Sequence, residues 1–525
     1  MEAVNLFLFP KRIPKKQDPK EHRIMKELVK QDLYDRLCAY SRSDYYPFHM
    51  PGHKRDSSWL SACVPQDPYR IDITEIDGFD NLHHAEGILK EAMEETASFY
   101  GAEASYFLVN GSTCGILSAI SACCDPGDTI LMARNCHKAA WHAAFLRNLK
   151  TIFVYPQYEP DFGIFGGLSP ESVQDLLTDH SHIRACFVVS PTYDGVVSDI
   201  RRIASVCHAH HIPLIVDEAH GAHFCYHESF PASALDCGAD LVIQSVHKTL
   251  PCFTQSALLH VGKASPYVDR QKLAHYLDIY QTSSPSYLLM AGIEEGIRYM
   301  AGAKEDLDRY LKALRSCRQA LGDLPHIRLF GPERIGHIAI YDYDITKLLL
   351  SAAAPDPDSP DSRKASGPLR ISGHRLSEVL RREHHLEMEM SSLTCVTAIT
   401  SVRDRAEGFL RLQKAMEAID RQIDQGILTP DSSCPVLPAD LCALRAEPVC
   451  GLAEAWMKES RQLPLSGSAG QVSAEFVYLY PPGIPLLIPG ERIDGDLLRL
   501  LQECRTSGFS LQGMADPAGQ TIRVL

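Results

Sequence analysis

The alternation of short apolar runs with helical patterns constrains the fold of this chain more than any other feature of its sequence. Strand-like runs are found at residues 105–109, 129–133, 185–189, 213–216 and 240–245. Helical patterns lie among them, at residues 88–100, 115–123 and 200–210. Strands that are apolar throughout and separated by helices are typical of a mainly parallel sheet covered on both faces. We therefore expect an α/β fold.

The chain has 525 residues, which is too long for a single compact core. Residues 351–368 are rich in Ala, Pro, Asp and Ser without a period, so we expect a mobile loop there. A second break lies at residues 430–438, after a helical pattern at 403–427. The predicted organisation is an N-terminal segment (1–45), a large α/β domain (46–315), a smaller α/β domain (316–430) and a C-terminal domain (431–525).

Composition argues against several classes of function. The formal net charge is −14, and outside residues 11–20 Lys and Arg form no long cluster, so we expect no nucleic-acid partner. No segment approaches the roughly 20 apolar residues of a membrane helix, so we expect no membrane association. The 17 cysteines include no Cys-x-x-Cys pair, which predicts a reduced, cytoplasmic protein without a metal site.

Ser245-Val-His-Lys248 follows the apolar run at residues 240–245. Ligands of open α/β sheets bind at the carboxyl ends of the strands, where a lysine with a depressed pKa can form a Schiff base with an aldehyde cofactor. Taken by itself, such a motif more often contains a solvated surface lysine. Lys248 is therefore a candidate Schiff-base lysine, and the case for it depends on the residues at the ends of the neighbouring strands.

A carboxylate ends another strand, in the motif Asp217-Glu-Ala-His220. Asp217 there can hydrogen-bond a pyridinium nitrogen and keep the ring of a cofactor protonated. The same four letters occur in nucleotide-hydrolysing helicases. That alternative requires a phosphate loop of the form Gly-x4-Gly-Lys-Ser/Thr, and the sequence contains none.

Asn110-Gly-Ser-Thr113 lies between a strand and a helix, where hydroxyls and backbone N–H groups form a phosphate-binding cup. A plain helix cap is the alternative. His137 follows the strand at 129–133, where its imidazole is either a stacking partner for a cofactor ring or merely structural. The phosphate cup, the carboxylate and the lysine together predict a site for pyridoxal 5′-phosphate.

Longer motifs are more specific. These are Pro47-Phe-His-Met-Pro-Gly-His-Lys54, Asp72-Ile-Thr-Glu75, Asn81-Leu-His-His84, Asn110-Gly-Ser-Thr113, Arg134-Asn-Cys-His-Lys138, Ser190-Pro-Thr-Tyr193, Asp217-Glu-Ala-His-Gly221, Ser245-Val-His-Lys248, Ser283-Ser-Pro-Ser-Tyr287, Tyr480-Pro-Pro-Gly-Ile-Pro485 and Ile488-Pro-Gly-Glu491. In these segments, from about residue 30 to 500, the chain resembles the fold-type-I, pyridoxal-phosphate-dependent ornithine/lysine/arginine decarboxylases. It resembles their shorter form, which lacks an N-terminal receiver-like domain.

The resemblance implies a role for each matching residue. Lys248 would form the Schiff base, and Asp217 would contact the ring nitrogen. His137 would stack on the ring, and His220 would lie on the side of its hydroxyl group. The residues implied around the phosphate are Ser112, Thr113, Ser245 and His247, with Ser283 and Ser284 contributed by a neighbouring subunit. The family also implies a homodimer or a larger oligomer built from dimers, a C-terminal α+β domain and a place in polyamine biosynthesis.

The chain departs from the family pattern at Cys114, which follows the phosphate motif, and in the length of the segment at 351–368. Decarboxylation requires a proton donor for Cα, and His247 and Lys248 are the candidates. Glu389 and Glu491 are candidates for binding the distal cation of a basic substrate, although each is equally well a surface carboxylate or part of a structural ion pair. We expect arginine as the substrate, then lysine, then ornithine. The alternatives are an aminotransferase or aldolase on the same fold, or a non-catalytic paralogue.

Overall fold

The computed structural model describes residues 37, 40–60, 68–159, 162–263, 265–353, 370–430, 446–479, 484–506 and 511–525. The chain divides into two units, residues 1–45 and 46–525. In the first unit the hydroxyl of Ser43 donates to the carbonyl of Tyr40 at 2.7 Å. All that follows concerns the second unit. The predicted loop at 351–368 and the break at 430–438 fall almost entirely outside the described residues.

A seven-stranded sheet forms the centre of the second unit, in the order β2-β11-β10-β9-β7-β3-β4. Its strands are β2 (Ala104–Leu108), β3 (Thr129–Ala133), β4 (Lys150–Val154), β7 (Ile183–Val189), β9 (Leu214–Asp217), β10 (Leu241–Gln244) and β11 (Ala257–Val261). The strands from β10 to β4 are parallel to one another, and β11 runs antiparallel to both of its neighbours. The predicted α/β fold with a mainly parallel sheet is confirmed.

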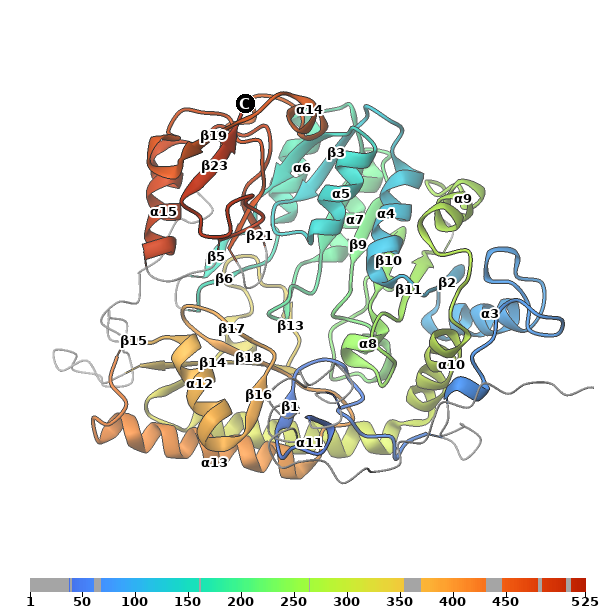
Figure 1. Cartoon of the computed structure of the whole chain (residues 1–525). Helices are drawn as coiled ribbons and strands as arrows, with labels where there is room; N and C mark the ends of the chain where they lie inside the picture. Colours follow the sequence, from blue (N-terminus) through green and yellow to red (C-terminus); the bar gives the residue numbers. More distant parts are fainter. Residues whose placement is uncertain are drawn as a thin grey trace, which may run out of the picture. The chain divides into compact units, whose positions relative to one another are not determined.

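Helices cover both faces of this sheet, which explains why its strands are apolar throughout (Figure 1). Ile130 and Met132 pack in one cluster with Trp141 of α5 (Lys138–Leu146) and with residues of α4 (Gly111–Cys123). Leu131 and Ala133, which alternate with them, pack with residues of α6 (Pro170–Asp179) and α7 (Ile200–Ala209). Alternate side chains of β3 therefore enter two separate cores.

Long helices surround the sheet and lead into the next region. They are α3 (Ile88–Tyr100), α9 (Arg270–Tyr280), α10 (Tyr287–Gly302) and α11 (Lys304–Gly322). The helical pattern at residues 88–100 predicts the observed bounds of α3. The helix ends at Gly101, whose φ of 70° lies in the left-handed region. Helix α4 begins at Gly111, earlier than the expected residue 115, so Ser112 and Thr113 form its first turn instead of a preceding loop.

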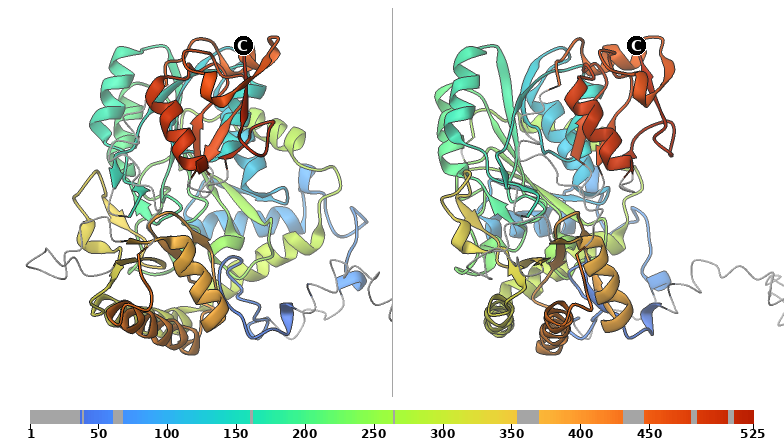
Figure 2. Two further views of the ribbon diagram at one scale, coloured as in Figure 1. Left: turned by 60° about the vertical axis from the view of Figure 1, so that its left-hand side comes forward. Right: turned by 90° about the vertical axis from the view of Figure 1, so that its left-hand side faces the viewer.

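A smaller antiparallel sheet follows, in the order β12-β14-β18-β17, with β15 paired to β14. Its strands are β12 (Ile327–Leu329), β14 (Lys347–Ala353), β15 (Arg370–Ile371), β17 (Met390–Ser391) and β18 (Val396–Ile399). Helices α12 (Gly373–His384) and α13 (Ala406–Asp424) belong to this region, and α13 packs against α11 (Figures 1 and 2). Short pairs join it to the earlier chain: β1 (Tyr46–Phe48) with β16 (Leu386–Met388), and β8 (Val196–Val197) with β13 (Asp342–Tyr343).

The C-terminal region has its own apolar core. It contains α14 (Leu452–Met457), α15 (Gly495–Thr506) and two small antiparallel sheets. The strands of these sheets are β19 (Arg461–Pro464), β20 (Val477–Leu479), β21 (Ile484–Leu487), β22 (Leu511–Gln512) and β23 (Thr521–Val524). A hairpin, β5 (Tyr158–Glu159) and β6 (Ile164–Phe165), completes the list of strands. The four-part domain division remains a prediction.

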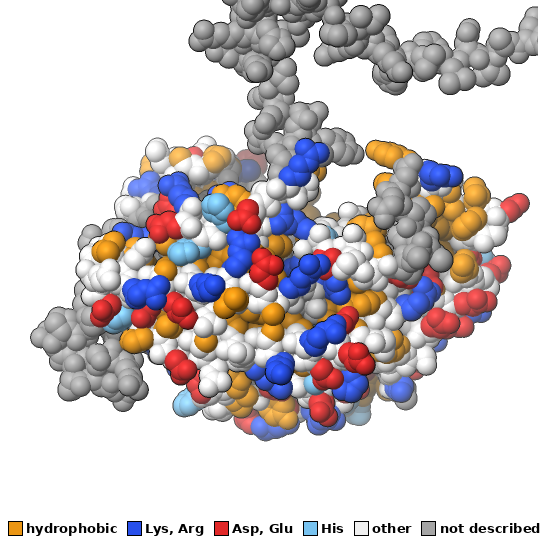
Figure 3. All heavy atoms as spheres, turned by 90° about the horizontal axis from the view of Figure 1, so that it is seen from below, with side chains coloured by type: hydrophobic (Ala, Val, Ile, Leu, Met, Phe, Trp, Pro, Cys, Tyr) orange, Lys and Arg blue, Asp and Glu red, His pale blue; other side chains and the backbone are white. Residues whose placement is uncertain are grey.

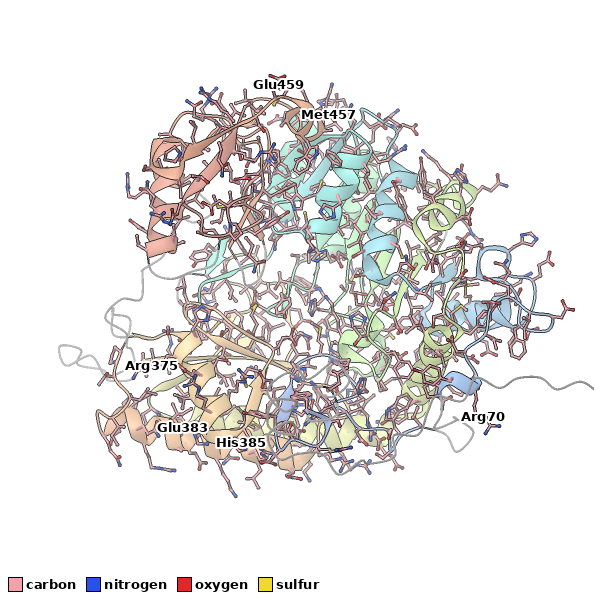
Figure 4. All side chains as sticks on the ribbon, in the orientation of Figure 1. Arg70, Arg375, Glu383, His385, Met457 and Glu459 are labelled. Atoms are coloured by element: carbon pink, nitrogen blue, oxygen red, sulfur yellow. The ribbon has the colours of Figure 1, made fainter. Side chains whose placement is uncertain are left out.

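Charges of both signs are interspersed over the face of the molecule drawn in Figure 3. Among the described residues, no helix is both long and apolar enough to cross a membrane. Side chains fill the spaces between the ribbons (Figure 4), and some apolar ones remain exposed, such as Met457 at the end of α14, which is 82% exposed.

Candidate active site

A cavity of about 320 Å³ lies at the carboxyl ends of the parallel strands. It is lined by Met50, Ser112, Asn135, Cys136, His137, Phe165, Val189, Pro191, Thr192, Tyr193, Asp194, Asp217, Ala219, His220, Lys248 and Glu389. The fold thus brings together these residues predicted for the site: Ser112, His137, Asp217, His220, Lys248 and Glu389. Asp217 ends β9, and the others except Glu389 lie within one helical turn of a strand's carboxyl end, which is where open α/β sheets bind ligands.

Lys248 belongs to α8 (Val246–Thr249), the single turn that follows β10. Its Nζ lies 2.9 Å from Nε2 of His220. Burial lowers the pKa of Lys248 to about 8; the negative charge of Asp217 opposes this shift, and the positive charge of Lys347 adds to it. The uncharged amine, which a nucleophile requires, is therefore far more populated near neutral pH than in an ordinary lysine.

Asp217 is the last residue of β9 and is 3% exposed. Its Oδ1 accepts a hydrogen bond from the backbone N–H of Ala219 at 3.1 Å. Burial raises the pKa of Asp217, and the charge of Lys248 opposes that shift. A buried carboxylate of this kind is suited to a cationic N–H partner, because a charge-assisted hydrogen bond offsets its desolvation.

Two imidazoles share the cavity wall. His137 caps the N-terminus of α5, where its Nδ1 accepts from the backbone N–H of Ala139 at 3.2 Å. Burial lowers the pKa of His137 to about 4, and Lys248 contributes to the shift. Burial also holds the pKa of His220 well below its usual value. Both rings are therefore neutral at physiological pH. The ring of His220 lies edge-on to the ring of Tyr193, with 4.8 Å between the ring centroids.

The residues predicted to surround a phosphate are less closely grouped. Ser112 lines the cavity, whereas Thr113, the next residue in the first turn of α4, is not part of the lining. Ser245 is fully buried, and its hydroxyl has no hydrogen-bond partner in the part of the chain that the structure describes. Nδ1 of His247 donates a hydrogen bond to the carbonyl oxygen of Ser256 at 2.8 Å.

Ser283 and Ser284 lie outside this cavity, in the exposed segment that precedes α10. Cys114 is buried, and its thiol donates to the carbonyl of Gly111 at 3.0 Å. Burial raises the pKa of Cys114 to about 12, so the helix N-terminus does not produce a reactive thiolate there.

These residues fit pyridoxal phosphate. The buried polar atoms without a partner in the described residues include the hydroxyl of Ser245 and Nδ1 of His220, as expected where polar groups of a ligand complete the hydrogen bonding. The N-terminus of the 13-residue helix α4 supplies N–H groups beside Ser112. Lys248 and Asp217 supply an amine and a carboxylate at the same cavity.

Glu389, between β16 and β17, contributes a second carboxylate to the cavity. One of its oxygens accepts a hydrogen bond from the hydroxyl of Tyr193, and the other accepts from the backbone N–H of Met50 at 2.7 Å. These two donors come from separate parts of the chain, and they fix the orientation of the carboxylate.

Glu491, the other predicted substrate contact, lies elsewhere. Its two carboxylate oxygens face the guanidinium of Arg134 at 3.0 Å each, and one of them also accepts from the backbone N–H of Ile488. Glu491 is 2% exposed and is not among the residues that line the cavity. The structure therefore places it in a buried ion pair between the large sheet and the C-terminal region.

Sequence reasoning missed three residues at or near the cavity. Tyr193 was recognised only as part of the motif Ser190-Pro-Thr-Tyr193, without a role, and Asp194 follows it directly. Both line the cavity. Lys347, the first residue of β14, is fully buried and influences the pKa of Lys248, but no sequence motif distinguishes it.

Comparison with protein families gives two matches. Residues 31–347 match the model described as "Orn/Lys/Arg decarboxylase, major domain", and residues 440–516 match "Orn/Lys/Arg decarboxylase, C-terminal domain". The first match covers the strands of the large sheet and the cavity residues except Glu389.

Relatives match along nearly the whole chain. An arginine decarboxylase of Bacillus anthracis is 30% identical over 94% of this chain and 97% of its own length, and one of Bacillus subtilis is 31% identical over the same shares. Among solved structures, a lysine decarboxylase of Francisella novicida covers 96% of this chain and 83% of its own with a TM-score of 0.73 at 18% identity. Lysine decarboxylase A of Pseudomonas aeruginosa covers 96% and 81% with a TM-score of 0.69 at 19% identity. These two structures support the fold.

Proposed function

Because the chain belongs to the ornithine/lysine/arginine decarboxylase family, we propose that it uses pyridoxal phosphate to release carbon dioxide from a basic amino acid, with arginine as the first choice, lysine the second and ornithine the third. The observation that carries the proposal is the meeting of Lys248 and Asp217 at one cavity. The identity of about 30% to arginine decarboxylases over 94% of the chain supports the order of substrates.

In this proposal the cofactor is held by residues at successive strand ends. Lys248 binds it covalently, Asp217 contacts its ring nitrogen, and His137 lies against the ring. His220 lies near the hydroxyl side of the ring. The phosphate is bound by the start of α4 and by the turn before α8, through Ser112, Thr113, Ser245 and His247. Ser283 and Ser284 contribute from a partner subunit.

When bound, the cofactor supplies an electron sink for the electron pair that remains on Cα after carbon dioxide leaves. The carboxylate of Asp217 holds a proton on the ring nitrogen, and its burial strengthens that interaction. The site orients the substrate so that its α-carboxylate bond is the one that breaks. Lys248 is favoured over His247 as the donor of the proton to Cα, because Lys248 lines the cavity whereas His247 does not.

Between the two candidate substrate carboxylates, the geometry favours Glu389. It lines the cavity, and its orientation is fixed by Tyr193 and by the backbone of Met50. Glu491 already has the guanidinium of Arg134 as its counter-charge and does not line the cavity, so it is not placed to contact a substrate there.

A homodimer, or a larger assembly of dimers, forms part of the proposal. Ser283 and Ser284 are exposed in the single chain, consistent with contact to a second subunit. The cytoplasmic location and the part in polyamine biosynthesis remain predictions from the sequence.

An aminotransferase on the same fold is the alternative chemistry, and such enzymes usually bind the α-carboxylate through an arginine. None of the described residues that line the cavity is an arginine, which favours loss of that carboxylate. A non-catalytic paralogue is disfavoured because the lysine, the aspartate and the start of α4 are all retained.

The test is product analysis after incubation of the cofactor-loaded protein with arginine, lysine and ornithine separately. We expect agmatine and carbon dioxide in equal amounts from arginine. A keto acid without carbon dioxide would instead identify an aminotransferase, and no product from any of the three would contradict the proposal.

A further inference from the structure

Asp194 lies in the loop between β7 and β8 and lines the same cavity as Lys248. The residue is only 6% exposed. Its carboxylate interacts with its own backbone N–H, and in the described part of the chain no hydrogen bond or ion pair joins it to another side chain. A buried carboxylate with so little compensation is unfavourable in its charged form, so a site of this kind favours a cation that enters with the ligand.

We propose that Asp194 binds the distal cation of the substrate, a guanidinium or an ammonium group, and thereby determines the preference for basic side chains. This inference rests on the proposed function and names a residue that sequence motifs did not reveal. The cation would supply the hydrogen bonds that the protein itself does not provide.

The other carboxylates of the cavity are less suited to this role. Glu389 already accepts hydrogen bonds at both of its oxygens, from Tyr193 and from the backbone of Met50. Asp217 accepts from the backbone of Ala219 and is influenced directly by the charge of Lys248. Asp194 is the described lining carboxylate for which no hydrogen bond from another residue is found, and we infer that Glu389 supports the same cation.

A structural role for Asp194 as the counter-ion of Lys347 is the competing explanation. The aliphatic part of Lys347 packs close to Gly195, which follows Asp194, and Lys347 is fully buried. However, Nζ of Lys347 lies 3.7 Å from Oδ2 of Asp344, which is also fully buried. Lys347 therefore has a carboxylate of its own, and Asp194 remains available for a ligand.

The surroundings of Asp194 predict how binding depends on pH. Asp194 has electrostatic interactions with Lys347 of β14, Tyr343 of β13 and Cys395, which precedes β18. Glu389 lines the same cavity. Burial raises the pKa of Asp194 to about 7, and the charge of Lys347 partly opposes the shift. Because a bound cation favours the ionised carboxylate, affinity for a cationic ligand should increase as pH rises through about 7.

The test compares two ligands of the same shape, agmatine and its uncharged isostere N-carbamoylputrescine, by calorimetry on the cofactor-loaded protein. We expect the wild type to prefer agmatine. In Asp194→Asn, agmatine should bind about 10- to 100-fold more weakly, whereas the affinity for the isostere should change by less than about twofold. The pH dependence near 7 should also disappear in this variant.

Asp342→Asn is the matched control, because Asp342 lies on the neighbouring strand β13 but does not line the cavity. We expect it to keep the preference for agmatine. A wild type without that preference, an Asp194→Asn variant that keeps it, or an equal loss of both ligands would overturn the inference. If Asp194→Asn alone removes the preference but no basic amino acid yields carbon dioxide, the cation site stands and the proposed decarboxylation fails.

Discussion

The amine of Lys248 lies 2.9 Å from Nε2 of His220, where the ends of two neighbouring parallel strands meet. Burial and the nearby charge of Lys248 keep the pKa of His220 well below its usual value, so its neutral ring accepts a hydrogen bond from the ammonium. The second ring nitrogen, Nδ1, has no partner within the described residues. His220 thus holds Lys248 at the cavity wall while leaving a polar atom for a ligand.

The lowered pKa of Lys248 predicts how the cofactor-free protein takes up pyridoxal phosphate. The uncharged amine is the reactive form, so the rate of cofactor uptake should rise with pH and level off above pH about 8. With an ordinary lysine, the rate would keep rising until pH about 10.4. Lys347→Met removes a positive charge that lowers this pKa and should shift the midpoint upward. Stopped-flow absorbance measures the rate, and a wild-type midpoint near 10 would contradict the assignment.

Asp217→Asn should leave the cofactor bound but slow turnover by about 100-fold or more, because a neutral amide cannot stabilise the protonated ring. The measurement is kcat for carbon dioxide release, with the bound cofactor quantified in the same samples. A variant with full cofactor content and wild-type kcat would show that Asp217 does not contact the ring nitrogen.

Tyr193→Phe removes the donor to one oxygen of Glu389. We expect kcat/KM for arginine to fall about 10- to 100-fold, the usual effect of losing one hydrogen bond to a charged group. Tyr226→Phe is the matched control, since its hydroxyl donates to Tyr100 at 3.1 Å and neither residue lines the cavity. Equal effects of the two substitutions would argue against a role for the Tyr193 hydroxyl in substrate binding.

Glu491→Gln should affect stability more than catalysis. It leaves the guanidinium of Arg134 buried without its counter-charge, which we expect to lower the free energy of unfolding by about 3 kcal/mol. Urea denaturation measures this change, and KM for arginine should remain near the wild-type value. A raised KM with unchanged stability would return Glu491 to the list of substrate contacts.

Much of the fold and part of the site follow from local sequence. Apolar strands such as β3 indicate a sheet covered on both faces, and the parallel strands necessarily bring their carboxyl ends to one edge. This is why Asp217, Lys248 and His137 could be grouped in one site from sequence, although they come from different strands.

The remaining features depend on contacts between distant segments. Tyr193 meets Glu389 across 196 positions, and Arg134 meets Glu491 across 357. No local period distinguishes a carboxylate that lines a cavity from one that is occupied by a buried arginine. For the same reason no sequence pattern distinguishes Asp194, because its significance lies in its burial at the cavity without a partner side chain.

The most direct test of the central claim is the release of labelled carbon dioxide from carboxyl-labelled arginine by the purified, cofactor-loaded protein and by Lys248→Ala. We predict release by the wild type together with a visible absorbance band of the bound cofactor. The variant should lose both. A wild type that carries the cofactor band but releases no label from arginine, lysine or ornithine would contradict the assignment as a basic amino-acid decarboxylase.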